Sequence, residues 1–218
     1  MRGLIPWCMI VSLLPAACGG LPPLREAAYP IDCRPGLSAQ ELLKRGDAHR
    51  DVMLSGTPPA NTVPEQWTPI RKIHAARART CYQLVLDAKQ DHAYALMNSG
   101  FTHLVESTYP ESTPEARDLA LVSATNFLQK AFDAEPLDAQ SYYYLGEIAA
   151  RRGQCDKALR IFQALVTSGW SYSHVYAWTG YCQELAGRSN DAKTSYQKAV
   201  TLSNPIGIAE WARSRVAP

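Results

Sequence analysis

The sequence lacks a strong excess of charge and the motifs that mark most catalytic and metal sites. Its 22 Lys and Arg residues nearly balance its 20 Asp and Glu residues, which leaves a formal net charge of +2. Because nucleic-acid-binding domains are usually strongly basic, we expect no nucleic-acid partner. The five histidines are scattered, the wide cysteine spacing fits no zinc pattern, and neither His-Glu-x-x-His nor Gly-x-Ser-x-Gly occurs. We therefore expect no enzyme, no metal, no cofactor and no small-molecule substrate.

Segments with the alternating pattern of β-strands are also lacking, so we expect an all-α protein. A content of 46% hydrophobic and 19% charged residues is globular and excludes disorder throughout the chain. One local basic cluster stands out, and we interpret it as a solvated helix face. The alternative is a patch for phosphate, lipid headgroups or an acidic partner. The cluster consists of Arg71, Lys72, His74, Arg77 and Arg79.

The N-terminus carries an export signal. Arg2 supplies a positive charge, and residues 4–14 form an apolar run that is too short to span a bilayer. Small residues then precede Cys18. We assign residues 1–17 to the signal peptide and the Pro-rich residues 18–37 to an extended tether.

The stretch Leu-Pro-Ala-Ala-Cys that ends at Cys18 resembles a bacterial lipoprotein signal. The resemblance implies that Cys18 becomes the diacylated N-terminus and anchors the chain to the membrane. Gly19 and Gly20 supply no acidic retention residue, so the resemblance implies the periplasmic face of the outer membrane. Pro15 stands where such signals usually carry an aliphatic residue. Ordinary cleavage after Ala17, which would give a soluble periplasmic protein, therefore stays open.

Cysteine usage agrees with export. Besides Cys8 and Cys18 the sequence contains four cysteines, an even number that an oxidising compartment can pair. Four cysteines allow three connectivities. The four are Cys33, Cys81, Cys155 and Cys182.

Local signals divide the rest of the chain into helices. Ser38 and Glu41 form a capping box that opens a helix running to about Leu54. After a loop at 55–63, Thr68 and Pro69 cap and begin a long helix that ends near Gln90. The expected elements that follow are a helix opened by Asp91, an inserted loop at 106–117, and a helix that restarts at Thr113–Glu115 and stops before Pro136.

Two segments in the C-terminal half repeat one pattern at a spacing of 34 residues. Each has a large residue, then a glycine, a second glycine, an alanine and an aromatic residue. This 34-residue helix–turn–helix pattern resembles the tetratricopeptide repeat (TPR). The first set is Tyr142, Gly146, Gly153, Ala158 and Phe162, and the second is Tyr176, Gly180, Gly187, Ala192 and Tyr196.

The resemblance implies a right-handed α-solenoid of antiparallel helix pairs with a C-terminal capping helix. Weaker matches extend the array toward the N-terminus, through Leu96 with Gly100 and Leu42 with Gly46. We divide the folded part into an N-terminal helical region with a degenerate repeat and an inserted loop (38–90), a repeat with an inserted loop (91–138), two regular repeats (139–172 and 173–205) and the capping helix (206–218).

The register of the repeats selects one cysteine pairing. Cys155 begins the second helix of one unit, and Cys182 lies late in the first helix of the next, so both lie near the same end of adjacent helices. We therefore predict a disulfide between them, and by elimination one between Cys33 and Cys81. The alternative is that the cysteines are buried free thiols.

In the TPR family the first helices line a concave groove, and the matching positions here mix aromatic and polar residues. Such positions suit recognition of a peptide or a helix. The alternative for Phe101 and Leu104 is packing against the chain's own segments. The candidate groove residues are Tyr94, Met97, Phe101, Leu104, Gln140, Tyr143, Glu147, Ala150, His174, Ala177, Tyr181 and Glu184.

The resemblance implies a binding function. We predict a lipid-anchored periplasmic scaffold or adaptor that binds an envelope protein or peptide and assists a machine such as a secretion system or pilus. A soluble periplasmic chaperone is the alternative within binding proteins. A cell-envelope hydrolase would need Glu147 and Glu184 to act as a carboxylate pair, whereas we interpret both as solvated groove acids. Self-assembly through the solenoid ends, dependent on Trp211, is a third alternative.

Overall fold

A computed structural model describes residues 32–55, 64–109, 112–202 and 211–215. The signal peptide, Cys18 and most of the tether lie outside the described residues. Within those ranges all regular structure is helical, and the described part of Cys33–Pro218 forms one compact unit. Its helices are α1 (Ala39–Leu54), α2 (Pro64–Ala88), α3 (Ala93–Glu106), α4 (Pro114–Ala134), α5 (Ala139–Arg151), α6 (Cys155–Thr167), α7 (Ser173–Leu185) and α8 (Ser189–Leu202), and residues 211–215 add a short helical segment.

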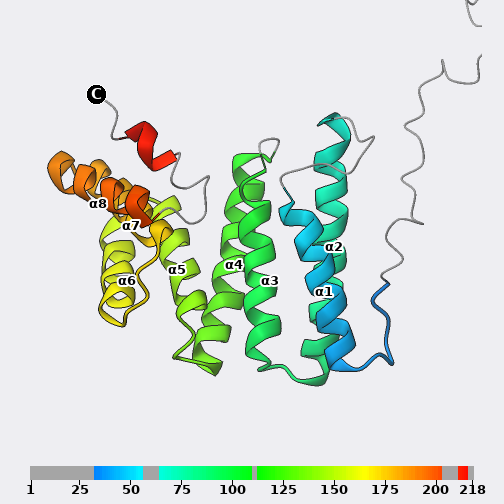
Figure 1. Ribbon diagram of the computed structural model, residues 1–218. Helices are drawn as coiled ribbons and strands as arrows, with labels where there is room; N and C mark the ends of the chain where they lie inside the picture. Colours follow the sequence, from blue (N-terminus) through cyan, green and yellow to red (C-terminus); the bar gives the residue numbers. More distant parts are fainter. Residues whose placement is uncertain (1–31, 56–63, 110–111, 203–210, 216–218) are drawn as a thin grey trace, which may run out of the picture. The chain divides into compact units, whose positions relative to one another are not determined.

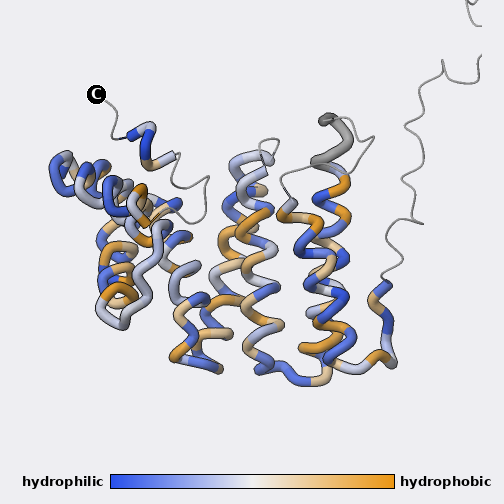
Figure 2. Tube along the Cα trace, viewed as in Figure 1, coloured by the Kyte–Doolittle hydropathy of each residue, from blue (hydrophilic) through white to orange (hydrophobic). Residues whose placement is uncertain are grey.

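The helices pack as four consecutive antiparallel pairs, α1–α2, α3–α4, α5–α6 and α7–α8, and each pair also contacts the next one (Figure 1). Hydrophobic and hydrophilic residues alternate along the helices (Figure 2). The apolar sides meet within and between pairs, where they form a large core, and a second, smaller cluster lies between α7, α8 and the C-terminal segment. The chain is thus the all-α solenoid that the repeat pattern predicts. None of its described helices combines the length and the apolar character needed to cross a bilayer.

A glycine in the first helix of every pair allows the second helix to come close. A Cβ atom added to Gly146 would lie 2.7 Å from Cε1 of Phe162, and one added to Gly180 would lie 2.7 Å from two ring atoms of Tyr196. The two N-terminal pairs repeat this contact despite their extra length. There Gly46 faces Tyr82, and Gly100 faces Leu128.

Side-chain caps explain the starts of α1, α3, α4 and α5. The Ser38 and Thr113 side chains accept hydrogen bonds from the amides of Glu41 and Ala116, as N-cap residues do. The prediction for α3 was one residue too early, because His92 rather than Asp91 is its N-cap. The inserted loop is also shorter than predicted, since α3 ends at Glu106 and α4 already begins at Pro114. Most of the extra residues lengthen α4 to 21 residues.

The predicted start of α2 at Thr68–Pro69 is wrong. The helix begins at Pro64, and Pro69 lies inside it. Proline fits at a helix start because the first amides have no partner within the helix. Near the start, Pro69 removes a single backbone hydrogen bond, and the helix continues through it.

The structure contains the disulfide between Cys33 and Cys81, which joins the segment before α1 to α2. The predicted bond between Cys155 and Cys182 is wrong, because both are free thiols. The register does place them together, since a hydrogen bond between the two thiols contributes to the shifted pKa of Cys182. Burial is the main cause that raises this pKa, which disfavours the thiolate that disulfide formation requires.

The basic cluster on α2 is only in part the predicted solvated face, because Lys72 is exposed but three other members make contacts within the fold. His74 is buried, Arg79 forms an ion pair of 2.5 Å with Glu106 of α3, and the Arg71 guanidinium lies 5.1 Å from the centre of the Tyr109 ring. Two of the histidines described above as scattered also meet. His49 of α1 and His74 of α2 are buried with their Nδ1 atoms 2.9 Å apart.

Candidate functional site

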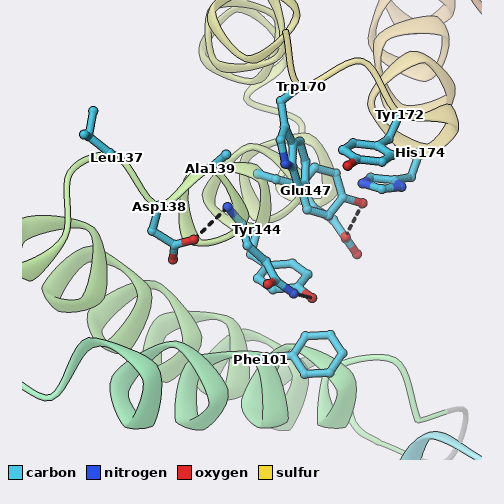
Figure 3. A pocket seen from close by; sticks show the side chains of 11 residues that line it. Phe101, Leu137, Asp138, Ala139, Tyr144, Glu147, Trp170, Tyr172 and His174 are labelled. Atoms are coloured by element: carbon cyan, nitrogen blue, oxygen red, sulfur yellow. Dashed lines mark hydrogen bonds between the residues drawn. The ribbon is translucent and has the colours of Figure 1, made fainter. Parts of the chain in front are cut away.

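A cavity of about 690 Å³ opens on the first helices of the second, third and fourth pairs (Figure 3). Its residues come from α3, from α5 and the turn before it, and from the turn between α6 and α7 together with the start of α7. Side chains from three consecutive repeats therefore converge on one space. A volume of this size accommodates a few side chains of a peptide or a small ligand.

Aromatic residues form two walls of the cavity. On one side the rings of Phe101 and Tyr144 stack with their centres 4.8 Å apart. The other side, which we call the aromatic corner, consists of Trp170, Tyr172 and His174. In this corner the Tyr172 and His174 rings are parallel with centres 5.6 Å apart, and the Trp170 ring meets both at steep angles (Figure 3).

The aromatic corner follows from an interruption in the helical pattern. Gly169 ends the turn after α6 with a φ of +88°, a conformation that favours glycine. The chain then places Trp170 and Tyr172 outside regular structure before α7 begins at Ser173. Tyr172 is 50% exposed, although aromatic side chains are usually buried. The turn thus presents large apolar rings at the surface.

The floor of the cavity is a buried polar network. The Tyr143 hydroxyl donates a hydrogen bond of 2.9 Å to Glu147, and Arg151 donates two more, of 2.9 Å from Nε and 2.7 Å from Nη2. Tyr143 also packs edge-on against His174 at 4.4 Å between ring centres. Burial raises the pKa of Tyr143 well above its usual value, and Glu147 raises it further, so the hydroxyl remains a donor. The network fixes the position of the Glu147 carboxylate.

The charges that line the cavity are negative. Asp138 and Glu147 belong to the lining, which includes neither Lys nor Arg. Burial lowers the pKa of His174 to about 4, so its imidazole is neutral at pH 7. Burial also raises the pKa of Tyr144 to about 12, so its hydroxyl is neutral as well. Arg151 compensates Glu147 from outside the lining, whereas Asp138 caps α5 by accepting bonds from the amides of Gln140 and Ser141.

A second cavity, of about 640 Å³, has the opposite character. Arg117, Arg151 and Arg215 line it together with aromatic residues of α7 and of the C-terminal segment. The Arg151 guanidinium lies 4.9 Å from the centre of the Trp178 ring, and Arg215 lies 5.6 Å from that of Trp211. Arg215 also pairs with Glu184 at 3.2 Å. The C-terminal segment thus covers part of the surface expected to form the groove.

The predicted groove residues therefore divide into several groups. The cavity brings together Phe101, Gln140, Tyr143, Glu147 and His174. Tyr181 lines the second cavity, and Tyr94 lines a hollow beside α1, where its hydroxyl bonds to Asp47. Glu184 accepts a bond from Tyr196. The remaining four are buried and line neither of the two cavities, namely Met97, Leu104, Ala150 and Ala177.

The description of Glu147 as a solvated groove acid was wrong, because Tyr143 and Arg151 hold it in a buried position. Glu147 and Glu184 each have separate partners. Among the described residues, no group of three His, Cys, Asp or Glu side chains is placed to hold a metal ion. Sequence reasoning also missed four residues, Tyr144, Trp170, Tyr172 and Trp178. For Trp170 and Tyr172 the sequence did hold a signal, because two aromatic residues stand in a turn where polar residues are usual.

Comparisons with known proteins agree with this architecture. The family model described as "Tetratricopeptide repeat" matches residues 140–168, which are α5 and α6. Among solved structures, a thermophilic TPR protein of Thermus thermophilus is 16% identical with a TM-score of 0.55, over 82% of this chain and 99% of that one. MamA is 17% identical with a TM-score of 0.49, over 71% of this chain and 92% of that one.

A third structure is YrrB, described as a TPR protein with an unusual peptide-binding site. It is 16% identical with a TM-score of 0.39, over 81% of this chain and 92% of that one. The comparison with curated proteins found no match. Proteins of the tetratricopeptide type generally mediate protein–protein interaction and act as non-catalytic scaffolds. The matched repeat and the helix-pair packing together show that this chain has the fold of a tetratricopeptide-repeat solenoid.

Proposed function

We propose that this chain is a scaffold that binds a segment of a partner protein in the cavity between α3, α5 and α7. The observation that carries the proposal is the aromatic-walled cavity, to which three consecutive repeats contribute. Aromatic residues beside a few fixed polar groups are typical of protein-binding surfaces, because a ring supplies large contact area at a low entropic cost. Tyr172 and Leu137, which are 50% and 98% exposed, provide apolar surface that a partner would cover.

The finer proposal places this scaffold at the periplasmic face of a bacterial outer membrane. Its support is the export signal and the lipoprotein-like sequence that ends at Cys18. A lipid anchor would hold the solenoid beside the membrane, where a component of an envelope machine such as a secretion system or pilus can be recruited. The Cys33–Cys81 disulfide is consistent with an oxidising compartment.

Site-specific photo-crosslinking in the native membrane tests the binding surface. A photoreactive residue replaces Gln140 or Tyr172, which are exposed at the cavity, and in matched controls it replaces Gln163 of α6 or Lys193 of α8, which are exposed outside it. We expect the same envelope protein to be trapped from both cavity positions and from neither control. Equal trapping from all four positions, or trapping from the controls alone, contradicts the proposal.

The anchor is tested separately with Cys18→Ala. We expect the wild type to incorporate a fatty-acid label and to sediment with outer membranes, and the variant to lose both properties. A Cys8→Ala variant serves as the control, because Cys8 lies within the signal peptide. Retention of the label in Cys18→Ala contradicts lipid attachment at this residue. Absence of the label from the wild type contradicts the anchor altogether, and the soluble periplasmic alternative then replaces it.

A further inference from the structure

The charges around the cavity identify the kind of side chain that it accepts. The inference rests on the proposed function and deepens it. The lining contains the carboxylates of Asp138 and Glu147 and neither Lys nor Arg. Arg151 compensates one of the two, which leaves Asp138 as a negative charge at the rim. Its oxygens already accept bonds from the amides of Gln140 and Ser141 and from the Ser141 hydroxyl, but these neutral donors do not cancel its charge.

The aromatic corner adds a second attraction for a positive charge. The face of an aromatic ring carries negative potential, so an ammonium or guanidinium group within about 6 Å of a ring centre is attracted to it. Trp170 is the ring type with the strongest attraction, and half-exposed Tyr172 lies beside it with centres 4.8 Å apart. His174 completes the corner in its neutral form and therefore does not repel a cation.

The two cavities differ in whether the chain's own cations lie over their aromatic rings. The rings of the second cavity are already occupied by such cations, since Arg151 lies over Trp178 and Arg215 over Trp211. In the aromatic corner the rings of Trp170, Tyr172 and His174 contact one another, and the lining around them includes neither Lys nor Arg. The aromatic rings of the second cavity are thus paired with cations of the chain itself, whereas those of the aromatic corner are not lined by such cations.

We propose that the cavity between α3, α5 and α7 binds a lysine or arginine side chain of the partner, with its cationic group against the aromatic corner and with Asp138 contributing the uncompensated negative charge of the lining. The aliphatic part of that side chain packs along Phe101 and Tyr144, as long basic side chains do on apolar surface. A purely apolar side chain would fill the same volume without using the charge. A higher affinity for a basic side chain than for an apolar one of similar length is therefore what the proposal predicts.

Three small probes measure this preference on the purified full chain. They are Nα-acetyl-lysine amide, Nα-acetyl-norleucine amide, which has a similar length and no charge, and Nα-acetyl-glutamate amide. Titration followed by the NMR signal of the Trp170 indole N–H gives an apparent Kd for each. We expect the lysine probe to bind roughly fivefold to thirtyfold more tightly than the norleucine probe, as cation–π contacts imply, and the glutamate probe to bind most weakly. The lysine advantage is expected to shrink at high salt.

Two variants test the assigned roles without removing the fold. Asp138→Asn keeps an efficient helix cap and removes the charge. Tyr172→Leu keeps apolar volume and removes the ring, and the Tyr172 side chain makes no capping bond that would be lost. Each should lower the advantage of lysine over norleucine by about threefold or more. Asp191→Asn, which removes an exposed carboxylate at the start of α8, should leave that ratio unchanged.

The possible outcomes separate this inference from the proposed function. Equal or tighter binding of the norleucine probe, tighter binding of the glutamate probe, or no response of Trp170 to any probe overturns the cationic preference. Crosslinks from positions 140 and 172 would still support a scaffold in each of these cases. Loss of those crosslinks overturns the scaffold, whichever probe binds.

Discussion

Replacing Gly146 with Ala tests the closest contact in the α5–α6 pair. The added Cβ would lie 2.7 Å from Cε1 of Phe162 and 2.9 Å from Cγ2 of Ile161, and real Cβ contacts are almost never shorter than 3.0 Å. Both neighbours are buried, with Phe162 1% and Ile161 5% exposed, so neither moves without disturbing the core. Overpacking of this kind costs about 1–3 kcal/mol. The better helix propensity of alanine stabilises the protein by roughly 1 kcal/mol relative to glycine.

We therefore expect Gly146→Ala to destabilise the protein by up to about 2 kcal/mol, as the difference between these two effects. Because the nearest atoms at Gly146 all belong to side chains, Phe162→Leu should relieve part of the clash. A double-mutant cycle measured by urea unfolding should then show a coupling of about 1 kcal/mol between the two substitutions. Such a coupling isolates the steric effect from helix propensity.

Gly100 provides the matched comparison. A Cβ added there would lie 2.6 Å from Cγ of Leu128, but also 3.1 Å from two backbone atoms, the carbonyl oxygen of Ala124 and the amide nitrogen of Leu128. Shortening Leu128 to Ala cannot remove the backbone contacts, so rescue of Gly100→Ala should be smaller than rescue at Gly146. The packing argument is refuted if Gly146→Ala stabilises the protein and the coupling with Phe162→Leu lies within about 0.5 kcal/mol of zero.

Three further predictions concern buried groups. Burial lowers the pKa of His74 from 6.5 to about 4, so the free energy of unfolding should fall as the pH drops below 6.5, by about 2 kcal/mol at pH 5. Urea unfolding at pH 7 and pH 5 should show a smaller loss of stability for His74→Gln than for the wild type. An equal loss would contradict the role given to His74. Reduction of Cys33–Cys81, which spans 48 residues, should lower the unfolding free energy by up to about 4 kcal/mol, whereas an unchanged unfolding midpoint in a reductant would contradict this role. Glu147→Gln should destabilise the protein by about 1–3 kcal/mol, because it weakens the buried network of Tyr143, Glu147 and Arg151. Glu184→Gln, at an exposed ion pair, should cost less than about 1 kcal/mol. A larger loss for Glu184→Gln than for Glu147→Gln would contradict the stabilising role of the network.

The repeated helix pairs could be predicted because their signals are local. Gly146 and Phe162 lie 16 positions apart in the sequence, as do Gly180 and Tyr196, and each pairing recurs within one helix–turn–helix unit. The helix caps are local as well, which is why Ser38 could be assigned from a few letters. The start of α2 was missed because a proline near the beginning of a helix and one just inside it look the same in sequence.

The candidate site was less predictable because it depends on side-chain direction and on irregular backbone. Repeat positions indicated Gln140, Tyr143 and His174 correctly as members of one surface. The same positions included Ala177, which packs in the core, because a position number does not say what the neighbouring helix covers. Trp170 lies in a turn without periodicity, so no repeat pattern could place it at the cavity.

Residues within the helices and residues in the turn before α7 differ in how far a substitution would disturb the fold. The regular positions Tyr143, Glu147 and Arg151 form the buried network that joins the two cavities, and the Arg151 guanidinium contacts Trp178 beyond it. Changing any of these residues leaves a partner unpaired in a buried site, which costs stability. Tyr172, by contrast, lies outside the helices, half exposed, and its side chain makes no helix-capping bond. Ligand preference can therefore change through a substitution of Tyr172 while the stacked helices keep their packing.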